Sequence, residues 1–490
     1  MSNNILNGFG IANFKCFKEE IIISQRPITI NIGPNNSGKS SLFKSFSLLQ
    51  GKKKISGNAQ FRNKLKMVDD LDSFNIKNFG MPEEFLNDNT KPLVFTIPTN
   101  SVFQRDWLKG KSISTKLFYN FANNSNESEA NNKNTSSKES IPQLGKLNRY
   151  QIYIDNNLYF EIFKTPSTAS KKKDTNSENI GVFNLTKFQL ASGVSNKEVN
   201  FQFTFPANTF GAIDILLKSI ETELNIYNIP NKDLIIEIID IVDQSLNSLR
   251  FEFSLMKFVD LNRREFGRYF DINNSTIFHD FHSYYFSRNE KKMANFDLKL
   301  KKLLHLFGIP EDFEIITNKN LGFQFLVKEK NGQIRNIADY GSGINQILPL
   351  ILSSISYIYN VQYYDDETKS YVDDIMPISV IVEEPESNFH PDFQSKLADL
   401  FMLLYKEWSL NFFIETHSEY MVRRFQNLIA QGKLKNSDVI INYFWVENGI
   451  NKCKPIQFRE DGGLTDVFEN GFYDESLLLE NSLLQFSNLN

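Results

Sequence analysis

One stretch, Gly33–Ser41, has the residue types and the spacing that bind a phosphate group. Its sequence, GPNNSGKSS, fits the phosphate-loop pattern G-x-x-x-x-G-K-S/T. The glycines permit a tight turn, so that backbone N–H groups at a helix N-terminus point at the phosphate. Lys39 is expected to bridge the β- and γ-phosphates, and Ser40 to hold Mg²⁺ through its hydroxyl. The candidate nucleotide-binding residues are Gly33, Pro34, Asn35, Asn36, Ser37, Gly38, Lys39, Ser40 and Ser41.

Two adjacent carboxylates end a second apolar run, ISVIVEEPESNFHP, at Ile378–Pro391. Successive side chains on a strand point in opposite directions, so Glu383 and Glu384 can do different jobs. One can hold the hydration shell of Mg²⁺ while the other polarises an attacking water. The alternative is a pair of surface glutamates, which Pro385 disfavours because it stops the strand directly behind them.

A histidine follows a third apolar run, in the sequence NFFIETHSEYMVRRF at Asn411–Phe425. The strand ends in Glu415 and Thr416, and His417 could donate a hydrogen bond to a γ-phosphate oxygen. In an open α/β sheet the ligand lies outside the carboxyl ends of the strands. We therefore expect the phosphate loop, the carboxylate pair and His417 to meet at one edge of a sheet.

A second helix start with phosphate-binding character lies in ADYGSGINQILPLIL, at Ala338–Leu352. Ser342 and Gly343 precede an apolar helical pattern, so free N–H groups, a helix dipole and a small hydroxyl are presented together. An ordinary Gly/Ser helix cap explains this motif equally well when it is taken alone.

The segments between these motifs predict mixed α and β structure. β-Type runs are expected before the loop, at Tyr150–Phe163, at Phe313–Thr317 and at Gly322–Glu329, and helices at Ile213–Ile226 and Leu234–Leu249. Two polar tracts, near 123–140 and 165–178, are nearly free of apolar residues and are expected to be flexible loops.

Composition indicates a folded protein, and its charge leaves room for no more than a local basic patch for nucleic acid. The chain has 490 residues, 41% hydrophobic, with a formal charge of −4 and two cysteines. The charge argues against a globally basic nucleic-acid coat, and two cysteines are too few for a disulfide framework. We see neither a secretory signal nor an apolar stretch fit to span a bilayer, and expect a cytoplasmic protein with no membrane contact.

Taken in chain order, the four motifs resemble those of ATP-binding-cassette (ABC) ATPases, in the branch related to overcoming-lysogenization-defect (OLD) proteins, RecF and the SMC group. GPNNSGKSS resembles the Walker A motif, VIVEEPESNFHP the Walker B motif with its D-loop, and ETHSEY the switch-histidine motif. GSGINQILPL resembles the signature of the OLD-like branch by position and helix context. The tail Gly462–Glu475 is similar to the end of stand-alone bacterial ATPases of this kind.

This resemblance implies an α/β fold: an ABC-ATPase (P-loop NTPase) head with a mixed sheet, interrupted by a long α+β insertion. The expected domains are 1–50 (Walker A part of the head), 51–334 (insertion) and 335–490 (signature, Walker B, D-loop and switch histidine). The implied cofactors are ATP and Mg²⁺, with Ser40 and Glu383 at the metal. Glu384 is implied as the catalytic base and His417 as the switch histidine, while Ser342 and Gly343 contact nucleotide.

The family sandwiches ATP between two subunits, so the resemblance also implies a homodimer or higher oligomer. Neither a Toprim nuclease nor another effector motif stands out, and the resemblance implies an antiphage ATPase that controls a separate effector, a nuclease or toxin. The alternative is a RecF- or SMC-like protein that closes on DNA when ATP binds. A P-loop kinase or GTPase does not require the paired carboxylates and the histidine, and the long insertion counts against a transporter ATPase.

Overall fold

The structure is a computed structural model. It describes residues 8–49, 82–99, 112–121, 146–165, 180–188, 201–206, 256–259, 268–270, 281, 290–309, 312–318, 322–329, 331–357, 363–365, 370–372 and 378–468. The helices expected at 213–226 and 234–249, the tract near 123–140, the tract near 165–178 after Thr165, and the tail after Phe468 lie outside these residues.

A six-stranded mixed sheet forms the centre of the molecule, in the order β10-β16-β17-β3-β18-β19. Its strands are β10 (Lys257–Val259), β16 (Ile378–Glu383), β17 (Leu410–Glu415), β3 (Ile28–Ile32), β18 (Val439–Glu447) and β19 (Ile450–Gln457). All neighbouring pairs are parallel except β18 with β19. Every residue of β3 and β17 is buried, as expected for strands covered on both faces. The predicted α/β class with a mixed sheet is confirmed.

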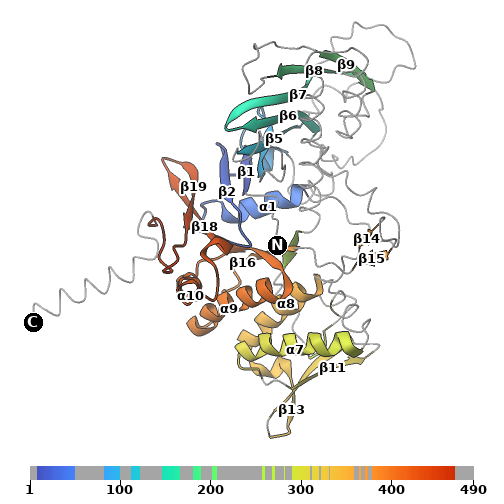
Figure 1. The fold of residues 1–490 in the computed structure, drawn as a ribbon, viewed down its shortest axis with the longest axis vertical. Helices are drawn as coiled ribbons and strands as arrows, with labels where there is room; N and C mark the ends of the chain where they lie inside the picture. Colours follow the sequence, from blue (N-terminus) through green and yellow to red (C-terminus); the bar gives the residue numbers. More distant parts are fainter. Residues whose placement is uncertain are drawn as a thin grey trace, which may run out of the picture.

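Helices cover both faces of this sheet. On β17, Phe413 packs against Phe46 of α1 (Lys39–Leu49), whereas its neighbour Phe412 packs against Phe401 of α9 (Pro391–Trp408). Because adjacent strand residues point to opposite faces, α1 and α9 lie on opposite sides of the sheet, as Figure 1 shows. The helices α8 (Ser342–Tyr357) and α10 (Glu419–Ala430) both contact α9.

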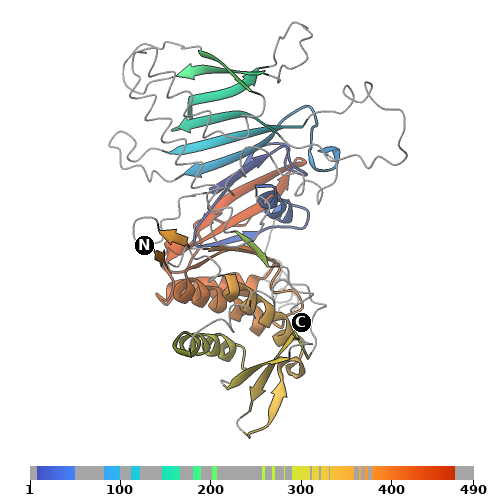
Figure 2. The ribbon, with the colours of Figure 1, turned by 90° about the vertical axis from the view of Figure 1, so that its right-hand side faces the viewer.

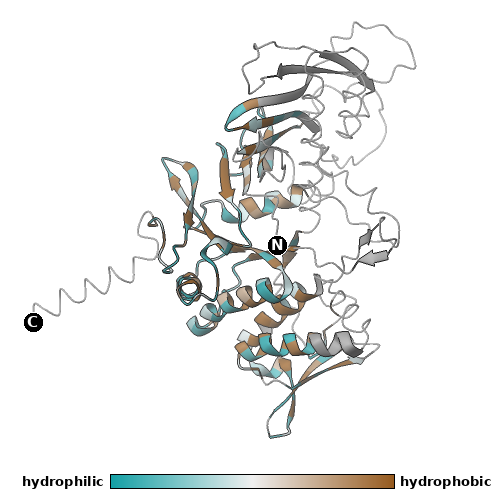
Figure 3. Cartoon of the chain, in the orientation of Figure 1, coloured by the Kyte–Doolittle hydropathy of each residue, from teal (hydrophilic) through white to brown (hydrophobic). Residues whose placement is uncertain are grey.

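The hydrophobic core lies between the central sheet and the helices on the α9 side. Figure 3 shows hydrophobic residues along the central strands and on α8. No helix in the described part of the chain is long and apolar enough to cross a membrane.

The central sheet and its covering helices form a unit that we call the head. An eight-stranded antiparallel sheet extends from one end of it, in the order β2-β1-β4-β5-β6-β7-β8-β9 (Figure 2). The strands are β1 (Gly8–Ala12), β2 (Ile21–Ser24), β4 (Leu93–Thr99), β5 (Ile113–Asn120), β6 (Lys146–Ile154), β7 (Asn157–Thr165), β8 (Ile180–Phe188) and β9 (Phe201–Pro206). The β structure predicted at Tyr150–Phe163 is confirmed, but as the two strands of a hairpin and not as one run. Asp155 and Asn156 take positive φ angles of 49° and 63° and form its two-residue turn.

The opposite end of the head carries α7 (Glu290–Leu306) and a three-stranded sheet of β11 (Phe313–Asn318), β12 (Gly322–Lys328) and β13 (Ile334–Asn336). The strands predicted at 313–317 and 322–329 are confirmed within a residue. Helix α7 packs on α9, with the rings of Phe296 and Trp408 5.6 Å apart. The remaining elements are α3 (Pro82–Phe85), η4 (Ile337–Tyr340), β14 (Tyr363–Asp365), β15 (Ser370–Val372) and η5 (Asn436–Asp438).

Residues 51–334 contribute to both large sheets. Strand β10 pairs with β16 at the edge of the central sheet, and β4 pairs with β1. The interval predicted as an insertion therefore supplies one strand of the central sheet as well as most of the eight-stranded sheet. The domain boundaries at 50 and 334 remain a prediction.

Candidate active site

The phosphate loop connects β3 to α1, and both of its glycines are required by their surroundings. Gly33 and Gly38 have φ angles of 152° and 104°, which side chains rarely adopt. A Cβ on Gly33 would lie 2.1 Å from the carbonyl oxygen of Phe444, and one on Gly38 would lie 2.5 Å from the ring of Phe17. The loop is also held from outside, because the side chain of Asn451 donates to the carbonyl of Ser37 at 2.9 Å.

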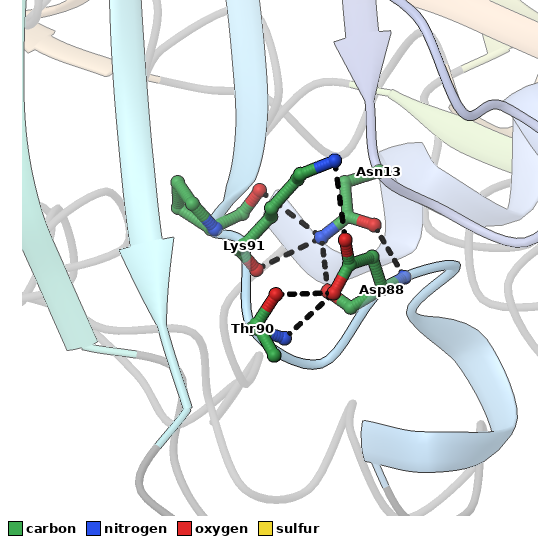
Figure 4. A network of polar contacts seen from close by, with 5 residues as sticks. Asn13, Asp88, Thr90 and Lys91 are labelled. Carbon is green, nitrogen blue, oxygen red and sulfur yellow. Dashed lines mark hydrogen bonds and ion pairs between the residues drawn. The ribbon is translucent and has the colours of Figure 1, made fainter.

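The turn after β1 presses Phe17 and Cys16 against the loop, and a polar network holds that turn in place (Figure 4). The amide of Asn13 donates to the carbonyls of Asp88 and Lys91, both at 2.8 Å, and its oxygen accepts from the N–H of Asp88. Asp88 in turn accepts from Thr90. The segment after α3 thus holds the turn after β1, and this turn lies next to Gly38 of the phosphate loop.

Lys39 lies inside the loop. It is 3% exposed, and its ammonium donates to the carbonyls of Gly33 and Pro34, each at 2.9 Å. Burial lowers its pKa, and the nearby carboxylates of Glu415 and Glu384 act in the opposite direction. The ammonium group is therefore hydrogen-bonded within the same loop that would surround a bound phosphate.

Ser40 contacts a carboxylate to which sequence reasoning assigned no role. Its hydroxyl donates to Oε1 of Glu415 at 2.8 Å, across a separation of 375 residues. Glu415 is 3% exposed, and its Oε2 is buried with no hydrogen-bond partner. Burial, with the charges of Glu383 and Glu384, raises its pKa to about 7 against the lowering effects of Ser40 and Lys39. The sequence feature that points to Glu415 is its position as the last residue of a buried strand, and Glu383 has the same position in β16.

The carboxylate pair lies at the same sheet edge. Glu383 is opposite Glu415 in the register of β16 with β17, and both members of the pair are exposed. Glu384 has a left-handed φ of 44°, and its N–H donates to the carbonyl of Glu415 at 2.8 Å. Its carboxylate accepts from the hydroxyl of Ser387 at 3.1 Å. A non-glycine residue in this conformation is strained, and such strain is common where a side chain must be aimed at a ligand.

His417 follows β17 and completes the group. Its backbone N–H donates to Oε1 of Glu386 at 2.6 Å, which anchors the histidine to the segment after β16. Burial lowers the pKa of His417, as does the charge of Lys39, while Glu384 acts to raise it. Burial raises the pKa of Glu386, a second residue that sequence reasoning missed. Donor atoms of Glu384, Glu415 and His417 lie within 4.8 Å of one another.

The signature-like residues lie elsewhere. Ser342 and Gly343 begin α8, directly after Gly341 with its φ of 88°. Helix α8 lies on the α9 side of the central sheet, whereas the phosphate loop continues into α1 on the other side. The structure thus brings together the loop, Glu383, Glu384 and His417, whereas Ser342 and Gly343 begin a helix on the other face of the sheet.

The donor set fits a nucleotide with a divalent metal ion. The hydroxyl of Ser40, the unpartnered oxygen of Glu415 and the adjacent carboxylate of Glu383 are oxygen ligands of the kind that Mg²⁺ prefers. Backbone N–H groups at the start of α1 suit phosphate oxygens. These features define a P-loop nucleotide-binding site at the carboxyl ends of parallel strands.

Comparison with known proteins agrees with that class. Residues 5–422 match the family of the AAA ATPase domain, and the chain belongs to this family. No curated protein matches the chain.

Similar solved structures include SMC heads, at low identity. The SmcHead bound to the C-winged helix domain of ScpA has a TM-score of 0.39 and 11% identity, covering 93% of this chain and 98% of that one. The SMC head domain from Thermotoga maritima has a TM-score of 0.36 and 11% identity, covering 92% and 98%. The Pyrococcus furiosus Smc head with an extended coiled coil, bound to the C-terminal domain of ScpA, has 0.37 and 10%, covering 92% and 96%.

Proposed function

We propose that this protein is an ABC-type ATPase that hydrolyses ATP to ADP and phosphate with Mg²⁺. The observation that carries the proposal is the contact of Ser40 with Glu415, because it joins the phosphate loop to the strand end that carries the other polar groups. Membership of the AAA ATPase domain family supports it.

Each residue has a role that follows from its position. Lys39 would leave the carbonyls of Gly33 and Pro34 to bind phosphate oxygens, and Ser40 and Glu383 would hold Mg²⁺, which neutralises phosphate charge when bound. Glu384 would accept a proton from the attacking water, since its carboxylate is exposed at the sheet edge. His417 has a lowered pKa, so its neutral imidazole can donate one hydrogen bond to a phosphate oxygen.

A second copy of the chain would complete the site. Ser342 and Gly343 begin a helix on the face of the sheet away from α1, the helix that continues from the phosphate loop. In a head-to-tail dimer they would contact ATP bound to the partner. ATP would then join the subunits, and hydrolysis would release them.

We further propose that this cycle controls or scaffolds a separate effector, a nuclease or toxin, in bacterial antiphage defence. Support comes from the resemblance of the four motifs to those of stand-alone ATPases in the OLD-like branch. The eight-stranded sheet, which projects from the head in Figure 2, offers an extended surface for such a partner.

The test is affinity purification of tagged Glu384→Gln protein from its native host with ATP and Mg²⁺. Glutamine removes the base and keeps the side-chain size, so the ATP-bound dimer should accumulate. The matched control is Glu384→Gln combined with Lys39→Ala, which should not be trapped. Mass spectrometry of the eluate should find a nuclease or another toxic protein that is absent from the control. Recovery of DNA without such a protein would contradict the effector proposal and favour the RecF- or SMC-like alternative.

A further inference from the structure

Three side chains beside the phosphate loop offer a ligand set of mixed chemistry. Carboxylate oxygens of Glu384 and Glu415 and an imidazole nitrogen of His417 lie within 4.8 Å of one another. Ligand atoms on a tetrahedral Zn²⁺ at about 2.1 Å are about 3.4 Å apart. Small side-chain rotations close that difference, and the exposed side of Glu384 leaves the cluster open to solvent ions.

Glu415 supplies an independent sign of a missing ligand. Its Oε1 accepts from Ser40, whereas its Oε2 is buried without any hydrogen-bond partner in a residue that is 3% exposed. An unpartnered buried carboxylate oxygen is costly, and native structures satisfy such atoms with a donor or a cation. A cation bound to this oxygen would remove the cost.

The local charge balance favours a cation as well. The cluster contains Glu384 and Glu415, with Glu383 opposite Glu415 on the neighbouring strand. The nearby cation is the ammonium of Lys39, which is hydrogen-bonded to the carbonyls of Gly33 and Pro34. Glu384 and Glu415 thus share the charge of one lysine, whose ammonium is hydrogen-bonded to backbone carbonyls.

The imidazole decides which cation fits. Mg²⁺ takes oxygen ligands and keeps much of its water, whereas imidazole together with carboxylates suits Zn²⁺ and similar transition metals. We infer that the nucleotide-free protein binds a divalent transition-metal ion of the Zn²⁺ class through Glu384, Glu415 and His417, and that Mg·ATP displaces it. Free transition metal would then hold the ATPase in its nucleotide-free state.

The metal-binding part of this inference is independent of ATP hydrolysis, whereas displacement by Mg·ATP rests on the proposed function. The experiment is therefore done first without nucleotide. EDTA-treated protein is titrated with Zn²⁺ against a chromogenic zinc indicator, and with Co²⁺ while its visible absorption is recorded. Wild-type protein should bind one Zn²⁺ per chain at this site and give a Co²⁺ spectrum with a nitrogen ligand.

The variants are His417→Gln, Glu384→Gln and Glu415→Gln, each of which removes one ligand. Each should weaken Zn²⁺ binding at least tenfold, since metal affinity is sensitive even to partners outside the ligand set. His417→Gln should also change the Co²⁺ spectrum. Glu384 is exposed and His417 is half-buried, so their variants test the ligand set without the change in stability expected for Glu415→Gln. The control is His305→Asn, an exposed histidine in the last turn of α7, which should bind Zn²⁺ like the wild type.

Two results would overturn the inference. If His417→Gln and Glu384→Gln both bind Zn²⁺ as tightly as the wild type, the metal binds elsewhere. A Co²⁺ spectrum of His417→Gln that equals that of the wild type would lead to the same conclusion. Zn²⁺ that stays bound when Mg·ATP saturates the protein would refute displacement while leaving the metal site intact. Failure of ATP to bind in a nucleotide titration without Zn²⁺ would instead count against the proposed function.

Discussion

The hydroxyl of Ser40 and the carboxylate of Glu415 are 2.8 Å apart, which joins the first turn of α1 to the last residue of β17. The contact is possible because β17 lies directly beside β3, the strand that enters the phosphate loop. Oε1 of Glu415 accepts from Ser40, whereas Oε2 has no hydrogen-bond partner. Glu415 therefore combines a structural contact with an oxygen that can bind a metal ion.

Glu415→Gln should stabilise the nucleotide-free, EDTA-treated protein at alkaline pH. Burial raises the pKa of Glu415 from 4.5 to about 7, so the folded state binds this proton more tightly than the unfolded state. The carboxyl group therefore contributes stability below about pH 4.5, and that contribution is lost as the pH rises through about 7. Glutamine cannot ionise and can still accept from Ser40. At pH 8 the variant should gain up to about 3 kcal/mol, a figure based on roughly 1.4 kcal/mol per pKa unit.

Urea unfolding of both proteins near pH 5 and pH 8 checks this prediction. The gain at pH 8 should shrink or vanish near pH 5, where the wild-type carboxyl group is largely protonated. An equal gain at both pH values would show that a change other than ionisation is responsible.

Lys39→Ala should weaken ATP binding by roughly 10- to 100-fold, because charged hydrogen bonds contribute about 1.5–3 kcal/mol. Titration with a fluorescent ATP analogue measures the affinity. Lys44→Ala is the matched control, since Lys44 is an exposed lysine of the same helix. Equal affinities for the two variants would contradict the role given to Lys39.

Gly38→Ala should lower the melting temperature more than Gly432→Ala. Both glycines have positive φ angles, 104° and 67°, so each alanine takes on an unfavourable backbone conformation that costs about 1–2 kcal/mol. Only at Gly38 does the new Cβ meet other atoms, with the ring of Phe17 at 2.5 Å and Sγ of Cys16 at 2.9 Å, whereas nothing lies within 4 Å at Gly432. Overpacking adds about 1–3 kcal/mol.

Thermal melts of the two glycine variants give the comparison directly. If they melt together, the turn after β1 does not press on the loop as the structure shows. The Gly38 variant should also lose ATP affinity, because the loop must move to admit the extra methyl group.

Asp399→Asn should destabilise the packing of α9 on α10. Asp399 is 9% exposed and accepts from Arg424 at 2.7 and 2.9 Å in a bidentate ion pair. Breaking a buried pair costs about 3–5 kcal/mol, and the partial exposure of Arg424 places the expected loss at or below the lower end of that range. Asp392→Asn, which loses an exposed pair with Lys396 on α9, should cost less than about 1 kcal/mol. Denaturant unfolding compares the two variants, and similar losses would rule out a special role for the buried pair.

Much of the site could be anticipated because its signals are local. The glycine spacing of the phosphate loop, the carboxylates behind β16 and the histidine behind β17 each follow a buried apolar run, and such runs predict strands. The strands β3, β16 and β17 are where those runs lie. The hairpin within Tyr150–Phe163 has no such local signal, because its turn at Asp155 and Asn156 contains no glycine and interrupts a run of β-type residues.

The sequence by itself determined the phosphate loop, the α/β class and the residues at the strand ends, because each depends on neighbours only a few positions away. Tertiary structure alone decided that Glu415 meets Ser40, that β10 joins the central sheet, and that α8 and α1 lie on opposite faces. These facts depend on which strands pair across hundreds of residues. Pairing of that kind is set by burial of the whole sheet on both faces, which no local pattern contains.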